Sequence, residues 1–180
     1  MKLLSYSPLH NFIWFQSTWF LAVLFGQHIE WLLFLLIALH VYLSGDWLQE
    51  LKVIVPCATL GVAVDCALSY FGVFMFTPDP SLLSIPIWLV AVWLALSGCF
   101  RHSMNYLIKK PLIMTILAAL FAPLSYIGAA RLGAVDLPLG QWQTGVIIGL
   151  CWLIVTPLLV GITHLAARTQ SDQKSAKVAE

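Results

Sequence analysis

The feature that most constrains this chain is a succession of long apolar runs separated by short polar breaks. A sliding window of about 19 residues finds these runs near 10–26, 29–46, 53–75, 86–107, 111–131 and 142–166. Each approaches or reaches the roughly 20 residues that an α-helix needs to cross the hydrocarbon core of a bilayer. We therefore expect an all-α fold: a polytopic membrane protein whose single domain, 1–167, is a bundle of six transmembrane helices.

The composition excludes an ordinary soluble protein. Hydrophobic residues make up 61% of the chain and charged residues only 9%, too few to cover the surface of a soluble domain. The net charge of +1 provides no basic surface for nucleic acid, so we expect no nucleic-acid partner. The expected partners are membrane lipids and a small-molecule or lipid ligand.

The distribution of Lys and Arg predicts the orientation. Only Arg131 lies on one side of the predicted bundle, and the cations on the other side are Lys2, Lys52, Arg101, Lys109, Lys110, Arg168, Lys174 and Lys177. Because cytoplasmic loops carry the excess of positive charge, both termini are expected in the cytoplasm of a cell with a bacterial inner membrane. The polar tail 168–180 lacks apolar periodicity and is predicted to be a disordered cytoplasmic end.

Asp65 is the ionisable residue deepest within an apolar run, with Ser97 of the fourth run at a similar depth. A charged group at the centre of a membrane helix costs about 2.5–3.5 kcal/mol on insertion scales, so each one is a candidate for function. Asp65 could carry a proton, ligate a metal or recognise a cationic ligand. Alternatively, a protonated Asp65 holds neighbouring helices together by hydrogen bonds.

Three histidines, His40, His102 and His164, fall in the cytoplasmic half of three different runs, with Gln16 at a comparable depth. Together with Asp65 and Ser103 they could form the zinc site of a membrane hydrolase, and two of them could ligate haem. No pair has the spacing i and i+4 that would place two ligands on one helix face. We therefore predict no metal site, with the three histidines as weak candidates, and favour no cofactor.

Two further polar groups are candidates for binding. His102, Ser103 and Asn105 recur on one flank of the fourth run, where simple anchoring by positive charge does not require them. Arg131 is the one cation on the outer side, where it could hold an anionic group, pair with an acidic residue or bind helix carbonyls.

The chain resembles an uncharacterised family of small six-span bacterial inner-membrane proteins, known as a domain of unknown function. The resemblance covers nearly all of the apolar region. It rests on Phe15-Gln16 with Trp19, Gly61 with Asp65 and Gly72, Pro86-Ile87-Trp88 with Trp93, His102-Ser103, Pro123-Leu124-Ser125-Tyr126, and Gly128-Ala129-Ala130-Arg131-Leu132-Gly133-Ala134. The chain departs from the family pattern at Arg101, where asparagine is expected, and at Phe121-Ala122, where glycines are usual. The resemblance implies the architecture and no activity.

Three functions compete. The first is binding or transport of a small molecule or lipid, with the ligand-binding residues Asp65, Ser97, Asn105, Tyr126, Arg131 and Gln16. The second is a membrane enzyme acting on lipid, with Asp65, His102 and Ser103 as acid–base or metal-site groups. The third is a structural scaffold without a ligand.

Overall fold

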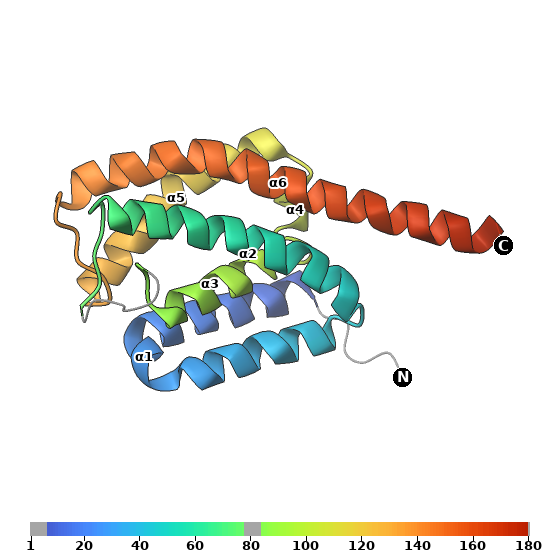
Figure 1. Ribbon diagram of the computed structural model, residues 1–180, viewed down its shortest axis with the longest axis horizontal. Helices are drawn as coiled ribbons and strands as arrows, with labels where there is room; N and C mark the ends of the chain where they lie inside the picture. The colour runs from blue at the N-terminus through green and yellow to red at the C-terminus, as the bar shows by residue number, and fades with distance from the viewer. Residues whose placement is uncertain (1–6, 78–83, 180) are drawn as a thin grey trace.

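The computed structural model describes residues 7–77 and 84–179, and their regular structure is helical (Figure 1). The helices are α1 (Pro8–Leu43), α2 (Trp47–Tyr70), α3 (Ile87–Ser97), α4 (Asn105–Ile108), α5 (Pro111–Arg131) and α6 (Gln141–Ala179). In the described part, the one extended pairing is an isolated bridge between Met75 and Asp136. The expected all-α fold class is confirmed.

Helix α1 contains the first two apolar runs. Its backbone leaves helical geometry at Ile29, with φ −127° and ψ 24°, directly after the polar break that separates the two runs. Figure 1 shows the chain folding back at this kink, so that the two arms of α1 lie side by side. We call them the first arm (8–28) and the second arm (30–43).

Several helices differ in extent from the predicted runs. Helix α2 begins at Trp47 instead of 53, and α3 ends at Ser97, so the second half of the run 86–107 consists of turns and the short α4. Helix α6 continues to Ala179, across most of the tail predicted to be disordered. Because no Gly or Pro follows Gly161 and the tail contains Ala, Gln and Lys, nothing in its sequence terminates the helix.

Helix α3 is the centre of the bundle. Every residue from Trp88 to Phe100 is buried or partly buried, and α3 packs between α1 and α2. Two glycines allow this close approach: a Cβ atom on Gly26 would overlap the side chain of Trp88, and one on Gly61 would overlap the ring of Trp93. Helices α5 and α6 pack against each other, and α6 also contacts α2.

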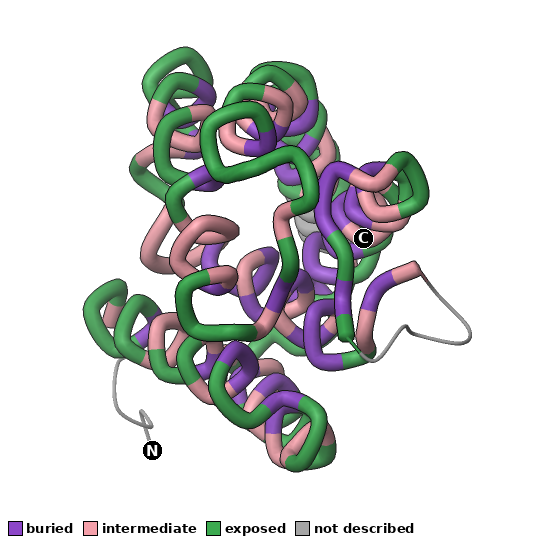
Figure 2. The backbone as a smooth tube through the Cα atoms, turned by 90° about the vertical axis from the view of Figure 1, so that its left-hand side faces the viewer, coloured by how far each residue is buried: buried purple, intermediate pink, exposed green. Residues whose placement is uncertain are grey.

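The outward surface is apolar, as a lipid-facing surface must be. Phe20, Phe121 and Ile154 are at least half exposed, and Figure 2 shows exposed residues lining the outward sides of the helices. In the described part of the chain, four helices are long and apolar enough to cross a membrane: Pro8–Leu43, Trp47–Tyr70, Pro111–Arg131 and Gln141–Thr169. These features define a multi-pass membrane protein.

Candidate functional site

A buried polar cluster centres on Asp65, which is 1% exposed. The indole Nε1 of Trp93 donates a hydrogen bond to Oδ2 at 2.6 Å, and the hydroxyl of Tyr126 lies 2.6 Å from both Oδ1 and Oδ2. These contacts join α2, α3 and α5. The described residues include no cation within ion-pair distance of Asp65, so neutral donors alone solvate the carboxyl group.

Aromatic rings surround this carboxyl group. Trp152 of α6 stacks on Trp93 with ring centroids 5.5 Å apart, and Phe74 stacks on Tyr126 at 5.0 Å. Asp65 lies five residues before the C-terminal end of α2 at Tyr70, or about 8 Å along the axis. Asp65 therefore lies closer to the C-terminal end of α2 than to its middle, because α2 starts six residues earlier and ends five residues earlier than the predicted run 53–75.

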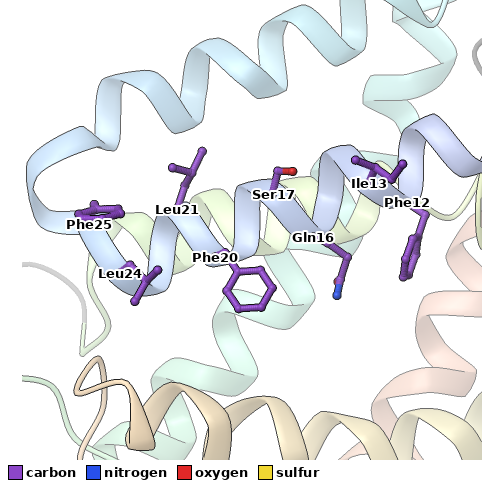
Figure 3. A pocket seen from close by; sticks show the side chains of 8 residues that line it. All are labelled: Phe12, Ile13, Gln16, Ser17, Phe20, Leu21, Leu24 and Phe25. Carbon is purple, nitrogen blue, oxygen red and sulfur yellow. The ribbon is translucent and has the colours of Figure 1, made fainter.

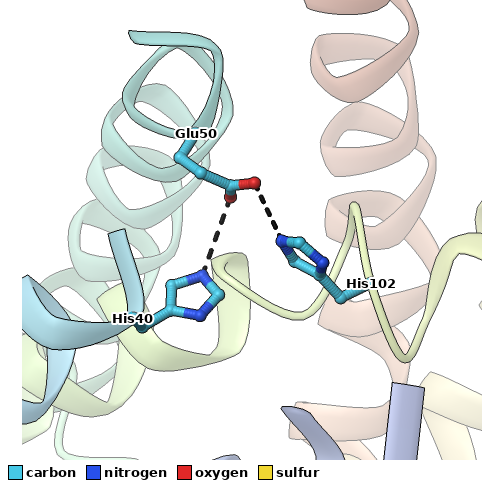
Figure 4. A group of neighbouring side chains, drawn as sticks. All are labelled: His40, Glu50 and His102. Atoms are coloured by element: carbon cyan, nitrogen blue, oxygen red, sulfur yellow. Dashed lines mark hydrogen bonds and ion pairs between the residues drawn. The ribbon is translucent and has the colours of Figure 1, made fainter. Parts of the chain in front are cut away.

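A second buried cluster lies at the opposite end of α2, around Glu50 (Figure 4). One carboxylate oxygen, Oε1, accepts hydrogen bonds from Arg101 Nη1 at 2.7 Å and from His102 Nε2 at 2.8 Å. The other oxygen, Oε2, lies 3.7 Å from His40 Nε2. Glu50 and His40 are each 1% exposed, so this charged group is almost entirely removed from solvent.

The backbone that carries His102 is held in place by Asn11. The Asn11 amide donates to the Gly98 carbonyl at 3.3 Å, and its oxygen accepts from the Ser103 amide at 3.2 Å and the Ser103 hydroxyl at 2.5 Å. Asn11 is 0% exposed. A single side chain of α1 thus provides partners for two backbone groups, the Gly98 carbonyl and the Ser103 amide, while other amides of these turns bond to carbonyls within the segment.

Two shallow surface grooves contain other predicted ligand residues. One, of about 480 Å³, follows the first arm of α1 and includes Gln16 and Ser17 among apolar side chains; Figure 3 shows these side chains along the arm. The other, of about 410 Å³, lies between α5 and α6 and includes Arg131, whose Nη2 donates to Gln141 Oε1 at 3.4 Å. Asp65 lines neither groove.

The predicted site residues are therefore divided among separate places. Asp65 and Tyr126 meet, and so do His40 and His102, but His164 is exposed on α6 and lies outside both clusters. Ser97 is buried, and its hydroxyl forms no hydrogen bond with a described residue. Asn105 is exposed on α4, while Gln16 and Arg131 lie at the grooves.

Glu50 and Asn11 were missed by the sequence analysis. Glu50 falls in the break between the second and third runs, where a charged residue in a loop is unremarkable. The structure instead places it in the first turn of α2, facing inward. Asp46 is the sequence signal that could have placed Glu50 in a helix, because aspartate is a preferred N-cap residue. In the structure it caps α2, and its side chain accepts a hydrogen bond from the Gln49 amide at 3.3 Å.

Fold and clusters together define a helical, multi-pass membrane protein with buried polar groups near both ends of α2. Residues 8–158 match the model of a family described as a protein of unknown function (DUF2878), and the chain belongs to this family. The predicted resemblance to an uncharacterised family is thus confirmed. No curated protein and no solved structure matches the chain.

Proposed function

We propose that this protein crosses a bacterial cytoplasmic membrane six times, with both termini in the cytoplasm. In this topology the two arms of α1 are separate crossings, and α3 with the turns up to α4 forms the fourth. The kink at Ile29 and the reversal of α1 support the count (Figure 1). The asymmetry of eight cations against Arg131 supports the direction.

We further propose that the protein binds or transports a small cationic molecule or a lipid with an amine-bearing headgroup, and that Asp65 holds this ligand. The observation that carries this proposal is the carboxyl group of Asp65, which is 1% exposed and paired with the neutral donors Trp93 and Tyr126. A cationic ligand that replaced the Tyr126 hydroxyl would gain the charge pair that the described residues do not supply.

The arrangement does not favour the enzyme built from Asp65, His102 and Ser103. His102 bonds to Glu50, Ser103 bonds to Asn11, and Asp65 bonds to Trp93 and Tyr126 near the other end of α2. A general base must lie within hydrogen-bond reach of the proton that it abstracts, directly or through one water. Asp65 and His102 therefore belong to different chemical environments.

Native mass spectrometry of the purified protein tests the binding proposal. We expect wild-type protein to carry a small adduct, and Asp65→Asn to lose it because the amide removes the negative charge at nearly constant shape. Asp136→Asn is the matched control, because Asp136 is exposed on the loop after α5. Wild-type protein without an adduct, or an Asp65→Asn protein that retains it, would contradict binding at Asp65 and leave the scaffold function.

A further inference from the structure

The cluster around Glu50 brings together side chains from three separate segments. His40 comes from the second arm of α1, Glu50 from the first turn of α2, and His102 from the turns after α3, as Figure 4 shows. Both imidazoles direct Nε2 toward the same carboxylate. One potential ligand atom from each residue lies within 4.8 Å of the other two.

These distances suit a metal ion. Zinc binds histidine nitrogen and carboxylate oxygen at about 2.0–2.2 Å, which places two ligand atoms of a tetrahedral site about 3.4 Å apart. The separation of His40 Nε2 and Glu50 Oε2 is 3.7 Å, and that of His102 Nε2 and Glu50 Oε1 is 2.8 Å. Small rotations of the three side chains therefore suffice to surround an ion.

The carboxylate has an oxygen available for a metal. Glu50 Oε2 is buried, and the His40 Nε2 atom that faces it lies 3.7 Å away, beyond the length of a normal hydrogen bond. An acceptor removed from water without a donor costs about 1–3 kcal/mol, and more when it is charged. A metal ion bound at Oε2 would offset this cost.

The surrounding residues hold the ligands in position. The ring of Trp14 stacks on His40 with centroids 4.4 Å apart and an interplanar angle of 17°. Gly98 leaves space for the same imidazole, since a Cβ atom there would lie 2.9 Å from His40 Nε2. On the other side, Asn11 fixes the turns that carry His102 through Ser103.

One side of the cluster faces outward. The side chain of His102 is 16% exposed and that of Arg101 is 25% exposed, whereas those of His40 and Glu50 are sealed. Three protein ligands with a more open side are characteristic of metal sites that keep one position for water or a substrate. Arg101 binds Oε1, so its charge opposes a nearby cation and its removal should strengthen metal binding.

From this geometry we propose that His40, Glu50 and His102 bind one divalent transition-metal ion, with zinc as the probe. Two imidazoles and one carboxylate are ligands that zinc accepts. The proposal is independent of ligand binding at Asp65, because the two clusters share no residue.

The test uses the full chain in detergent, washed with EDTA and titrated with Zn²⁺ against a chelating dye. We expect wild-type protein to bind one zinc per chain, and His102→Ala and Glu50→Gln to bind it at least tenfold more weakly. His164→Ala is the matched control, because this exposed histidine lies outside the cluster and should leave zinc binding unchanged. Arg101→Gln should bind zinc at least as tightly as wild type.

A second measurement separates lost ligation from lost folding. His102→Cys supplies a thiolate at the same position, so this variant loaded with Co²⁺ should show a thiolate charge-transfer band that wild-type protein lacks. The proposal is overturned if wild-type protein binds no stoichiometric zinc, if His164→Ala weakens binding as much as His102→Ala, or if His102→Cys shows no such band.

Discussion

At the scale of single residues, Asp65 and Glu50 show two ways of burying a carboxyl group in a membrane protein. Asp65 is surrounded by the neutral donors Trp93 and Tyr126, while Glu50 is bonded to Arg101 and His102. Burial of a carboxylate without such partners costs several kcal/mol. Removal of a single partner should therefore reduce stability measurably at either place.

Tyr126→Phe removes the hydroxyl that lies against both oxygens of Asp65. We expect it to lower the free energy of unfolding by about 1–3 kcal/mol, because Oδ1 loses its hydrogen-bond donor while Trp93 still donates to Oδ2. Denaturant unfolding in detergent micelles provides the measurement. Tyr106→Phe, at a residue 65% exposed, is the control and should change stability little; equal effects of the two variants would refute a special contact at Asp65.

Gly61→Ala tests the close approach of α2 to α3. The added methyl group would overlap the ring of Trp93, which must then move away from Asp65. We expect destabilisation of about 1–3 kcal/mol, as is typical of overpacking. Gly161→Ala is the matched control within a helix, because its added Cβ would meet no atom within 4 Å beyond its chain neighbours and the backbone of its own helix, and it should be neutral or stabilising. A Gly61→Ala protein as stable as wild type would show that the two helices separate easily.

At the scale of elements, the notable feature is the interruption between α3 and α4. Helix α3 has 11 residues, about 17 Å, and residues 98–104 continue as turns. Irregular backbone at membrane depth requires partners within the protein. Local turn hydrogen bonds supply many of these partners, and Asn11 of α1 supplies those of the Gly98 carbonyl and the Ser103 amide. The interruption places His102 beside Glu50.

Asn11→Ala should loosen this interruption. The change removes the donor to Gly98 and the acceptor for Ser103, which corresponds to about 2–4 kcal/mol of local stability. Hydrogen exchange followed by mass spectrometry should show faster exchange in the peptide that covers residues 98–104, with α5 unchanged. Asn105→Ala removes an exposed amide and serves as the control. Unaltered exchange in Asn11→Ala would mean that other contacts hold the turns.

At the scale of the whole molecule, the proposed six crossings place the Glu50 cluster toward the cytoplasm and the Asp65 cluster toward the outer side. The connection at Ser44–Asp46 and the turns before α5 lie at one end of the bundle, and the loop between α5 and α6 lies at the other (Figure 1). Both clusters are therefore near a membrane interface, where a ligand can arrive from water or from the headgroup layer.

Cysteine labelling in intact cells tests this topology. Gln143→Cys, at the start of α6, should react with a membrane-impermeant maleimide, whereas Lys109→Cys should react only after the cells are permeabilised. Both native residues are exposed, Cys57 and Cys99 are buried, and the partly buried Cys66 and Cys151 are replaced by Ala to remove background labelling. The reverse labelling pattern would place the termini outside.

The sequence alone determined the class of protein, because long apolar runs and scarce charges allow few solutions besides membrane helices. The break after Gly26 and the start of α5 at Pro111 also follow from local patterns, and the same patterns make Asp65 a candidate. These are properties of short segments, which propensity and hydrophobicity describe directly. The family resemblance added matching motifs without an activity.

Only the tertiary structure decided which polar residues meet. Asp65 is hydrogen-bonded to Tyr126, 61 positions away in the sequence, and His102 to Glu50, 52 positions away. His164 and Asn105 are exposed and lie outside both clusters. Such contacts depend on how each helix is rotated about its axis and where it ends, and a uniformly apolar helix has no polar face from which to read that rotation. Asp65, the residue that the sequence singles out most clearly, thus acquires its partners, and with them its chemistry, from the packing of α2 against α3 and α5.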